Sequence, residues 1–124
     1  MRLTVALCTY NRAYVLRQTL AGFARQNCPR DQFEVLVIDN NSRDHTAAVV
    51  AEFAHSVPTP RHVRETQQGL DYARNRAIHE ARGDIIIFGD DDIVVEPDWL
   101  TQMLAPFATA NAEHIGAVGG EVIP

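Results

Sequence analysis

The chain has 124 residues, of which 46% are hydrophobic and 22% charged, and this balance predicts one globular domain. Its formal net charge of −5 argues against nucleic acid as a partner, because proteins that bind nucleic acid are normally basic. All 11 basic residues are arginine. The absence of lysine excludes both a P-loop phosphate site, which needs a lysine, and Schiff-base chemistry.

Strand and helix patterns alternate along the chain. In chain order, the first half predicts a strand at 3–8, a helix from Asn11 to about residue 24, a strand at 34–38, and a helix from Ser42 or Asp44 to about residue 55. The second half predicts a short strand around residue 63, a helix at 70–81, a strand at 84–88, a helix from Pro97 to about residue 107, and a strand at 115–124.

Capping and breaking residues set the expected helix ends. Asn11 is a suitable N-cap for the first helix, and Pro29 closes that helix. Gly83 stops the helix at 70–81. Pro97 suits the first turn of the last helix, because proline lacks only an N–H group that would be unpaired there anyway.

Strands that are apolar throughout and separated by helices predict an α/β fold with a mainly parallel, Rossmann-like sheet flanked by helices. Ligands of such sheets bind beyond the carboxyl ends of the strands. Three of the predicted strands end in polar runs: TYNR at 9–12, DNNS at 39–42 and DDD at 90–92. The carboxyl edge of the sheet is therefore the predicted functional site.

Three like charges follow the buried strand at 84–88. Unit charges about 4 Å apart repel by roughly 1 kcal/mol even in water, so a positive group is expected beside them. A divalent cation such as Mg²⁺ or Mn²⁺ takes carboxylate oxygens as ligands. Alternate residues share a face, so Asp90 and Asp92 would point together and Asp91 elsewhere. The alternative is a solvated acidic turn that caps the next helix.

The other two polar runs suit a nucleoside. Tyr10 offers an aromatic face, and Asp39 or Asn40 offers a hydrogen-bonding edge. Each also has a structural explanation, Tyr10 as a packing residue and Asp39 as a turn or cap residue. A dinucleotide-binding domain is disfavoured, because its first turn needs glycines and the run CTYNR has none.

Four segments, in this order and spacing, resemble family 2 glycosyltransferases of the GT-A fold: CTYNR, EVLVIDNNSRD, GLDYARNRAIHEARGDIIIFGDDD and PDWL. The resemblance covers essentially the whole chain. It implies a nucleotide-diphospho-sugar donor with a UDP, TDP or GDP carrier, a DXD-type site for Mn²⁺ or Mg²⁺, and sugar transfer to an acceptor hydroxyl, usually with inversion.

The resemblance also assigns roles residue by residue. Nucleotide binding falls to Thr9, Tyr10, Asn11, Asp39, Asn40, Arg74 and Asp91. Asp92 is the first choice as metal ligand, with Asp90 at the other end of the DXD motif. Family members often carry a second aspartate where this chain has Asn40, whose neutral amide can still donate and accept hydrogen bonds. Arg74 either contacts the nucleotide or pairs with an acid of the neighbouring loop.

The catalytic base of the family normally lies in the acceptor-binding half, so we expect it beyond Pro124. Residues 1–124 are accordingly predicted to be a donor-binding domain cut before that half, with an exposed sheet edge that favours self-association. The acceptor would be a glycan, a lipid or a small molecule. Two alternatives stay open: a non-catalytic nucleotide-sugar-binding module, and a metal-dependent phosphohydrolase or nucleotidyltransferase.

The expected location is the cytoplasm, with the cytoplasmic face of a membrane as a further option. The two cysteines, Cys8 and Cys28, fit neither a disulfide framework nor a metal-binding spacing. The apolar stretch at the N-terminus is too short for a signal peptide or a membrane span.

Overall fold

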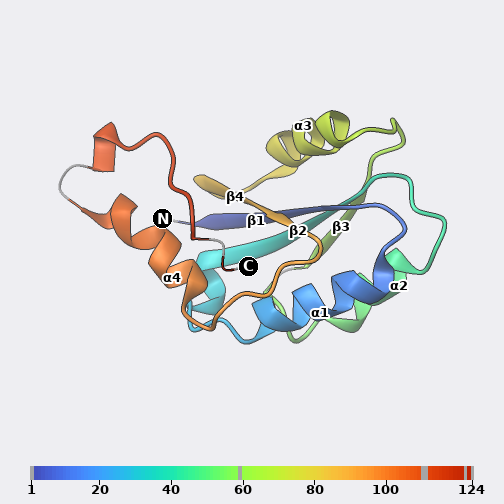
Figure 1. The fold of residues 1–124 in the computed structure, drawn as a ribbon, viewed down its shortest axis with the longest axis horizontal. Helices are drawn as coiled ribbons and strands as arrows, with labels where there is room; N and C mark the ends of the chain where they lie inside the picture. Colours follow the sequence, from blue (N-terminus) through green and yellow to red (C-terminus); the bar gives the residue numbers. More distant parts are fainter. Residues whose placement is uncertain (1, 59, 110–111, 122, 124) are drawn as a thin grey trace.

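The computed structural model describes residues 2–58, 60–109, 112–121 and 123. It contains one sheet of four parallel strands in the order β3-β2-β1-β4 (Figure 1). The strands are β1 (Leu3–Thr9), β2 (Phe33–Asp39), β3 (Arg61–Arg64) and β4 (Ile85–Asp90). The predicted α/β class is confirmed, and every pairing within the sheet is parallel.

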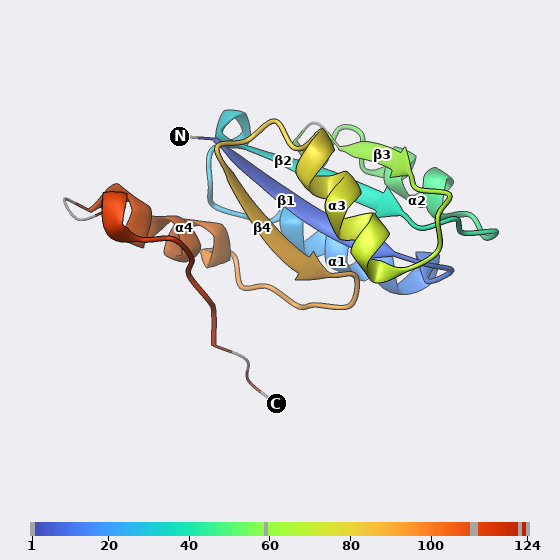
Figure 2. The same ribbon diagram turned by 90° about the horizontal axis from the view of Figure 1, so that it is seen from above.

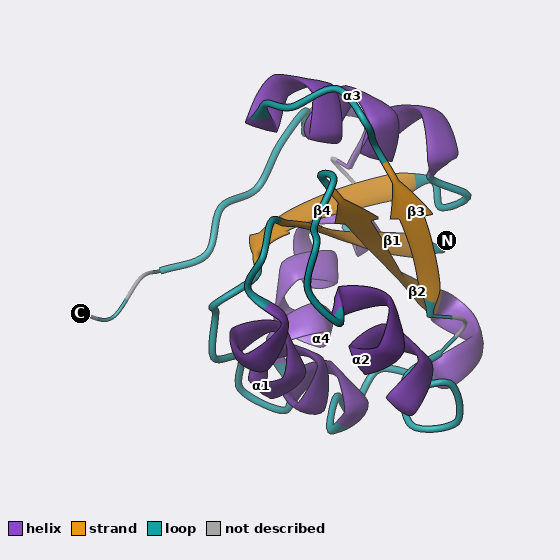
Figure 3. Cartoon of the chain, turned by 90° about the vertical axis from the view of Figure 1, so that its right-hand side faces the viewer, coloured by secondary structure: helices purple, strands orange, loops and turns teal. Residues whose placement is uncertain are grey.

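Helices cover both faces of this sheet (Figure 3). The α-helices are α1 (Ala13–Ala24), α2 (Thr46–Glu52), α3 (Leu70–Glu80) and α4 (Trp99–Leu104). Short 3₁₀ turns occupy Arg30–Gln32, Ala105–Ala108 and Ala112–His114. Helix α3 lies alone on one face, over β1 and β2 (Figure 2), whereas α1, α2 and α4 lie on the other.

The two faces differ in how much apolar surface they bury. The larger core lies toward α1, α2 and α4 and includes Leu7, Leu16 and Phe23. On the other face, α3 contributes only Ala73 and Ala77. Small side chains let α3 lie close to the sheet, but they bury little area, and hydrophobic stabilisation is proportional to the area buried. The placement of α3 therefore depends on polar contacts as well.

The loop after β1 departs from the prediction. Asn11 does not cap α1. Arg12 occupies the N-cap position, and its side chain forms no capping hydrogen bond. Asn11 instead adopts a left-handed conformation with φ of 51°, which asparagine tolerates better than most residues. Its Oδ1 accepts a hydrogen bond from the backbone N–H of Arg43 (2.7 Å). Asn11 thus ties the loop after β1 to the loop after β2.

The N-cap position of α2 belongs to His45 rather than to Ser42 or Asp44, but the side chain of Asp44 bonds to the starts of two helices. Asp44 Oδ1 accepts a hydrogen bond from the N–H of Thr46 at the start of α2 (3.1 Å). Its Oδ2 accepts one from the N–H of Ala13 at the start of α1 (3.1 Å). One carboxylate therefore satisfies donors at both helix starts, where negative charge is also favoured by the helix dipoles.

Helix α1 ends at Ala24, as predicted, and Pro29 lies beyond it. Two other helices are shorter than their patterns predicted. Helix α2 ends at Glu52 rather than near residue 55. Helix α4 begins at Trp99, two residues after Pro97, and the chain continues beyond it as a 3₁₀ turn. Neither proline lies within an α-helix.

The strand predicted at 115–124 is not present: residues 115–121 and 123 form no strand, and residues 122 and 124 lie outside the described part. Residues 115–118 instead run beside β4 and line a hollow of about 560 Å³ with it. The two glycines that follow, Gly119 and Gly120, have low strand propensity. Among the described residues β4 therefore pairs only with β1, and its outer edge is open.

Within the described ranges, no helix is both long enough and apolar enough to cross a bilayer.

A carboxylate is buried at the amino end of the sheet. Glu34 of β2 is 0% exposed. It accepts hydrogen bonds from Thr4 Oγ1 (2.7 Å) and Arg61 Nε (3.1 Å). The backbone N–H of Arg82 donates a third (2.9 Å). Burial alone would raise the pKa of Glu34, but these hydrogen bonds and the Arg61 charge outweigh it and lower that pKa below its ordinary value.

Replacing Glu34 with alanine is expected to lower the free energy of unfolding by about 3 kcal/mol, because Arg61 loses a buried partner. Glu52→Ala is the matched control, since Glu52 forms a pair with Arg17 (2.8 Å) in which both side chains are exposed. That change should matter little, because water and salt screen exposed pairs. Denaturant unfolding measures both variants. Equal losses of unfolding free energy in the two variants would contradict the claim that the buried pair contributes more than the exposed pair.

Candidate functional site

The carboxyl ends of the strands meet at one edge, as predicted. The register places Thr9 beside Asp39 and Cys8 beside Asp90. A pocket of about 540 Å³ opens at this edge. Its walls are the end of β1 (residues 8–10), Arg12, Asn40, the start of α3 with the two residues before it (68–70), and the three aspartates at 90–92. The structure thus brings together most of the residues that the sequence singled out.

Asp91 points inward, whereas its two neighbours are exposed. Only 5% of Asp91 is exposed, and its carboxylate accepts a hydrogen bond from Thr9 Oγ1 (2.8 Å). Thr19 Oγ1 of α1 donates to the Asp91 backbone carbonyl (2.7 Å). Burial raises the pKa of Asp91, and the hydrogen bond from Thr9 and the charge of Arg12 offset only part of that rise. Through its side chain and its backbone carbonyl, Asp91 therefore connects the end of β4 to β1 and α1.

Arg12 is the positive group beside the three aspartates. Its Nη1 lies 2.8 Å from Asp91 Oδ1, and its Nη2 lies 3.2 Å from Asp92 Oδ2. The Arg12 side chain is 45% exposed. The guanidinium bridges the two carboxylates and compensates the repulsion expected between them.

Asp90 and Asp92 are the carboxylates that a cation could reach, because both are exposed and both line the pocket. Within the part of the chain that the structure describes, no three His, Cys, Asp or Glu side chains converge closely enough to form a metal site by themselves. Mg²⁺ and Mn²⁺ commonly use one or two carboxylates and complete their shell with water and substrate phosphates. The donors present fit that kind of site.

Asp39 is buried rather than open to the pocket. It is 2% exposed. Its Oδ1 accepts from the N–H of Ser42 (2.8 Å), and its Oδ2 lies 2.8 Å from His62 Nε2. Burial would raise the pKa of Asp39, but the hydrogen bonds from Ser42 and His62 outweigh it and lower the pKa. A direct role of Asp39 in nucleotide binding stays a prediction.

The remaining predicted residues differ in position. Tyr10 is 47% exposed and lines the pocket, with its ring available to a ligand. Asn40 also lines the pocket, but its amide is bonded within the protein. Arg74 lies exposed on α3, and its charge acts on Cys8. Asn11 lies outside the pocket wall and bonds to the neighbouring loop.

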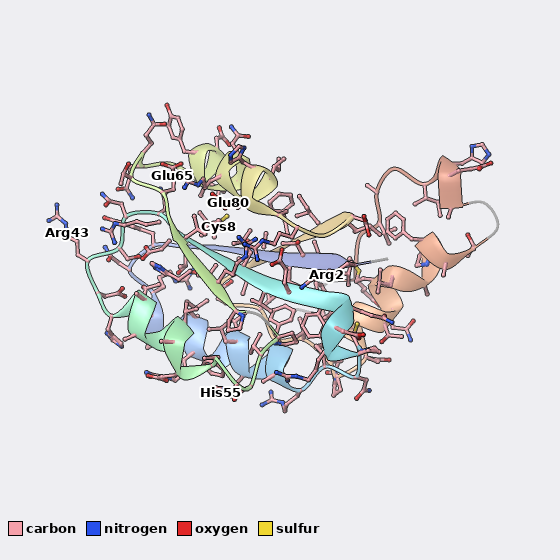
Figure 4. All side chains as sticks on the ribbon, turned by 180° about the vertical axis from the view of Figure 1, so that it is seen from behind. Arg2, Cys8, Arg43, His55, Glu65 and Glu80 are labelled. Atoms are coloured by element: carbon pink, nitrogen blue, oxygen red, sulfur yellow. The ribbon has the colours of Figure 1, made fainter. Side chains whose placement is uncertain are left out.

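Cys8 forms part of the pocket wall but is not a nucleophile at neutral pH. Figure 4 shows Cys8 on the sheet face that α3 covers, while Arg43 points outward from the loop after β2. Burial raises the pKa of the Cys8 thiol to about 11, against the opposing charge of Arg74. The thiol therefore stays protonated, as expected for a small packing residue.

Sequence reasoning placed Arg12 in the polar run at 9–12 but gave it no role, and it missed the segment 68–70. Arg12 directly follows the end of β1, and the need for a positive group near the aspartates was the signal that could have identified it. The segment 68–70 follows β3, the shortest strand of the sheet. The rule that ligands bind beyond strand ends applies to that strand too, and would have added this segment to the site.

The lowered pKa of Asp39 predicts how stability should depend on pH. In the folded chain Asp39 stays charged at a pH where the unfolded chain, with a pKa of about 3.9, already takes up a proton. The stability that Asp39 contributes is therefore present above that value and is lost as the pH falls through the folded pKa. Asp39→Asn should destabilise the chain most at neutral pH, with a gap that shrinks in acid. Denaturant unfolding from neutral pH into acid measures the difference in unfolding free energy between the two chains. A difference that stays constant with pH would contradict the account.

Comparison with known proteins identifies relatives over nearly the whole chain. The sequence model named "Glycosyl transferase family 2" matches residues 4–119. The Bacillus subtilis protein named uncharacterized glycosyltransferase YfnE is 32% identical over 119 residues, which make up 96% of this chain and 30% of that protein. Glycosyltransferase AglE of Haloferax volcanii is 30% identical over 120 residues, or 96% of this chain and 38% of AglE. The chain thus spans about a third of the length of these relatives.

Solved structures agree with these matches. The mannosyltransferase PcManGT from Pyrobaculum calidifontis, in complex with GDP-Man and Mn²⁺, is similar with a TM-score of 0.81 and 32% identity, covering 89% of this chain and 33% of that one. Staphylococcus aureus TarS in complex with UDP-GlcNAc also gives 0.81, at 25% identity, and covers 100% of this chain and 37% of that one. The parallel sheet, the polar pocket at its carboxyl edge and these matches together establish that the chain belongs to glycosyl transferase family 2.

Proposed function

We propose that the chain is the donor-binding part of a glycosyltransferase and holds a nucleotide-diphospho-sugar in the pocket at the carboxyl edge of the sheet. The observation that carries this proposal is the pocket's content: two exposed carboxylates, Asp90 and Asp92, lie in it together with the exposed ring of Tyr10. The ligands in the two related structures, GDP-Man and UDP-GlcNAc, support the proposal. They carry different bases, so the base itself is to be measured.

We place a divalent cation, Mn²⁺ or Mg²⁺, on Asp92, with Asp90 as its neighbour. Two carboxylates suffice if the diphosphate supplies further oxygen ligands. The presence of Mn²⁺ in the PcManGT complex supports this choice. Bound there, the cation would neutralise charge that develops on the departing diphosphate. Asp91, buried and bonded to Thr9, orients the turn that carries Asp90 and Asp92.

Arg12 has two states in this proposal. In the first it compensates Asp91 and Asp92 through its two ion pairs. With a cation held by Asp92, the exposed guanidinium would be free to pair with the diphosphate, which its planar fork matches well. Arg12 and the cation therefore compete for Asp92, whereas Arg12 and the diphosphate attract each other.

We propose a transfer step of the kind that the family resemblance implies. An acceptor hydroxyl would attack the anomeric carbon from the face opposite the diphosphate, with a carboxylate taking its proton and with inversion as the outcome. We expect that base and the acceptor site outside residues 1–124. Nucleoside contacts through Thr9, Tyr10, Asn11, Asp39, Asn40 and Arg74 are part of the proposal. Self-association through the open edge of β4 is likewise a proposal.

Asp92→Asn is the direct test of the metal assignment. Calorimetry with UDP, TDP and GDP in the presence of Mn²⁺ should show metal-dependent binding by the unmodified chain. The variant should bind at least about tenfold more weakly, the loss typical when even an outer-shell partner of a metal is removed. Asp31→Asn is a charge-matched control, because Asp31 lies exposed in the turn before β2, at the opposite end of the sheet. Equal affinity of the two variants would refute the assignment.

Arg12→Gln tests the competition for Asp92. Removing the guanidinium frees this carboxylate, so the variant should bind Mn²⁺ alone several-fold more tightly than the unmodified chain does. Its binding of UDP should not improve in parallel, because the diphosphate loses a cationic partner. The electron paramagnetic resonance signal of free Mn²⁺ reports the first quantity. Arg17→Gln, which removes an exposed arginine paired with Glu52, is the control. Weaker Mn²⁺ binding by Arg12→Gln would contradict the account.

A further inference from the structure

The segment that joins β4 to α4, residues 91–98, carries two of the three aspartates and forms neither helix nor strand. Such a segment has no ladder of backbone hydrogen bonds, so its carbonyl groups need other partners. Three residues of α1 contact it: Thr19, Gly22 and Gln26. They lie three and four positions apart and therefore share one face of the helix. We call these three residues the α1 stripe.

Thr19 is the member of the stripe that contacts an aspartate. It is 1% exposed, and its Oγ1 donates to the backbone carbonyl of Asp91 (2.7 Å). The carbonyl oxygen of Ile93 lies 3.3 Å from the same hydroxyl. A threonine within a helix can bond to a carbonyl of its own helix, but both of these acceptors lie outside α1. Thr19 therefore connects α1 to the acidic turn.

The bond from Thr19 acts on Asp92 through the peptide plane. The carbonyl of Asp91 and the N–H of Asp92 belong to one planar unit, which can rotate only as a whole. A bond that fixes this carbonyl oxygen thus fixes the direction in which the chain enters Asp92. Thr9 Oγ1 holds the same residue through the Asp91 carboxylate (2.8 Å). Asp91 is therefore held at its side chain by β1 and at its backbone by α1.

The rest of the stripe holds the later part of the segment. A Cβ atom at Gly22 would lie 3.1 Å from Val95 Cγ2, so the missing side chain lets the segment approach the helix closely. Gln26 Nε2 donates to the carbonyl of Glu96 (2.7 Å), and its Oε1 accepts from the N–H of Leu100 in α4 (2.9 Å). One face of α1 therefore holds the segment at successive points.

We propose that the α1 stripe is a positioning surface for the cation site, and that Thr19 is a positioning residue for Asp92. Thr19 is buried and acts by holding the peptide unit that precedes Asp92. This inference rests on the proposed function. Without the bond, the turn would sample other orientations, and the apparent affinity for the cation would fall in proportion to the fraction of molecules in the competent one.

Thr19→Val and Thr19→Ser test the role of the hydroxyl. Valine removes the hydroxyl and keeps the shape of the side chain, whereas serine keeps the hydroxyl. Calorimetry with and without Mn²⁺ measures the factor by which the metal tightens UDP binding. This factor should fall about fivefold in Thr19→Val, the equivalent of one typical hydrogen bond, because the metal-dependent part of binding uses Asp92. Thr19→Ser should restore it.

Thr4→Val is the matched control, the same change at an equally buried threonine near the opposite end of β1. Thr4 is 0% exposed, and its Oγ1 donates to Glu34 Oε1 (2.7 Å). This variant should lose stability, because a buried hydrogen bond is removed, but it should keep the full Mn²⁺ factor. A purely structural effect would lower the factor in both valine variants.

The amide spectrum of the metal-free chain reports the contact without any ligand. The N–H of Asp92 shares a peptide unit with the Asp91 carbonyl, so its resonance should shift when that carbonyl loses the hydrogen bond from Thr19. The Asp92 amide signal should therefore move in Thr19→Val, return in Thr19→Ser, and stay in place in Thr4→Val. An unchanged signal in Thr19→Val would overturn the inference.

The binding outcomes separate the inference from the proposed function. If a folded Thr19→Val chain keeps the full Mn²⁺ factor, or if Thr4→Val loses as much of it, the inference is wrong while the proposed function stands. If Thr19→Val does not fold, Gln26→Met decides. It removes bonds farther from Asp92 and should lower the factor by a smaller amount, so an unchanged factor would overturn the inference. If Mn²⁺ does not tighten UDP binding by the unmodified chain, the proposed cation site fails and the inference falls with it.

Discussion

The parallel pairing of β1 with both β2 and β4 is the constraint on which the site depends. Because β1 lies between these two strands and runs in their direction, the ends of all three reach the same edge of the sheet. The apolar residues of β1 and β2 are buried on both faces, so the strands cannot slip without exposing them. The core thus fixes where the polar strand ends lie, although it contributes none of their chemistry.

Polar bonds between loops then shape this edge. Asp91 joins the end of β4 to Thr9, and Asn40 joins the end of β2 to the segment before α3. Both side chains are nearly buried and are bonded within the protein. The exposed groups beside them in the pocket include Asp92 and Tyr10. Arg12 supplies positive charge that offsets the repulsion among the three aspartates when no cation is bound.

The sequence was sufficient to predict the α/β class, the positions of the four parallel strands and the edge that carries the site, because apolar runs separated by helices predict buried parallel strands. It was insufficient where a residue's role depends on a distant partner. Asn11 is of a residue type typical of helix caps, yet its side chain accepts a hydrogen bond from the backbone N–H of Arg43 in the neighbouring loop. The pattern at 115–124 is that of a strand, but a strand also requires a partner edge, and the described residues run past β4 without pairing. Asn40 was predicted at the site, but the sequence alone does not show that its amide bonds to the backbone carbonyls of Glu65 and Gln67.

Paramagnetic broadening by Mn²⁺ in the amide spectrum of the UDP-saturated chain is the most direct test of the central claim. A cation held by Asp92 at the carboxyl edge should selectively broaden the amides of residues 90–92, of residues 9–12 and of the segment before α3. Amides at the opposite end of the sheet, such as those of Arg30–Gln32, should stay sharp. Broadening centred on that opposite end, or no selective broadening with UDP bound, would contradict the assignment of the donor site to the three aspartates.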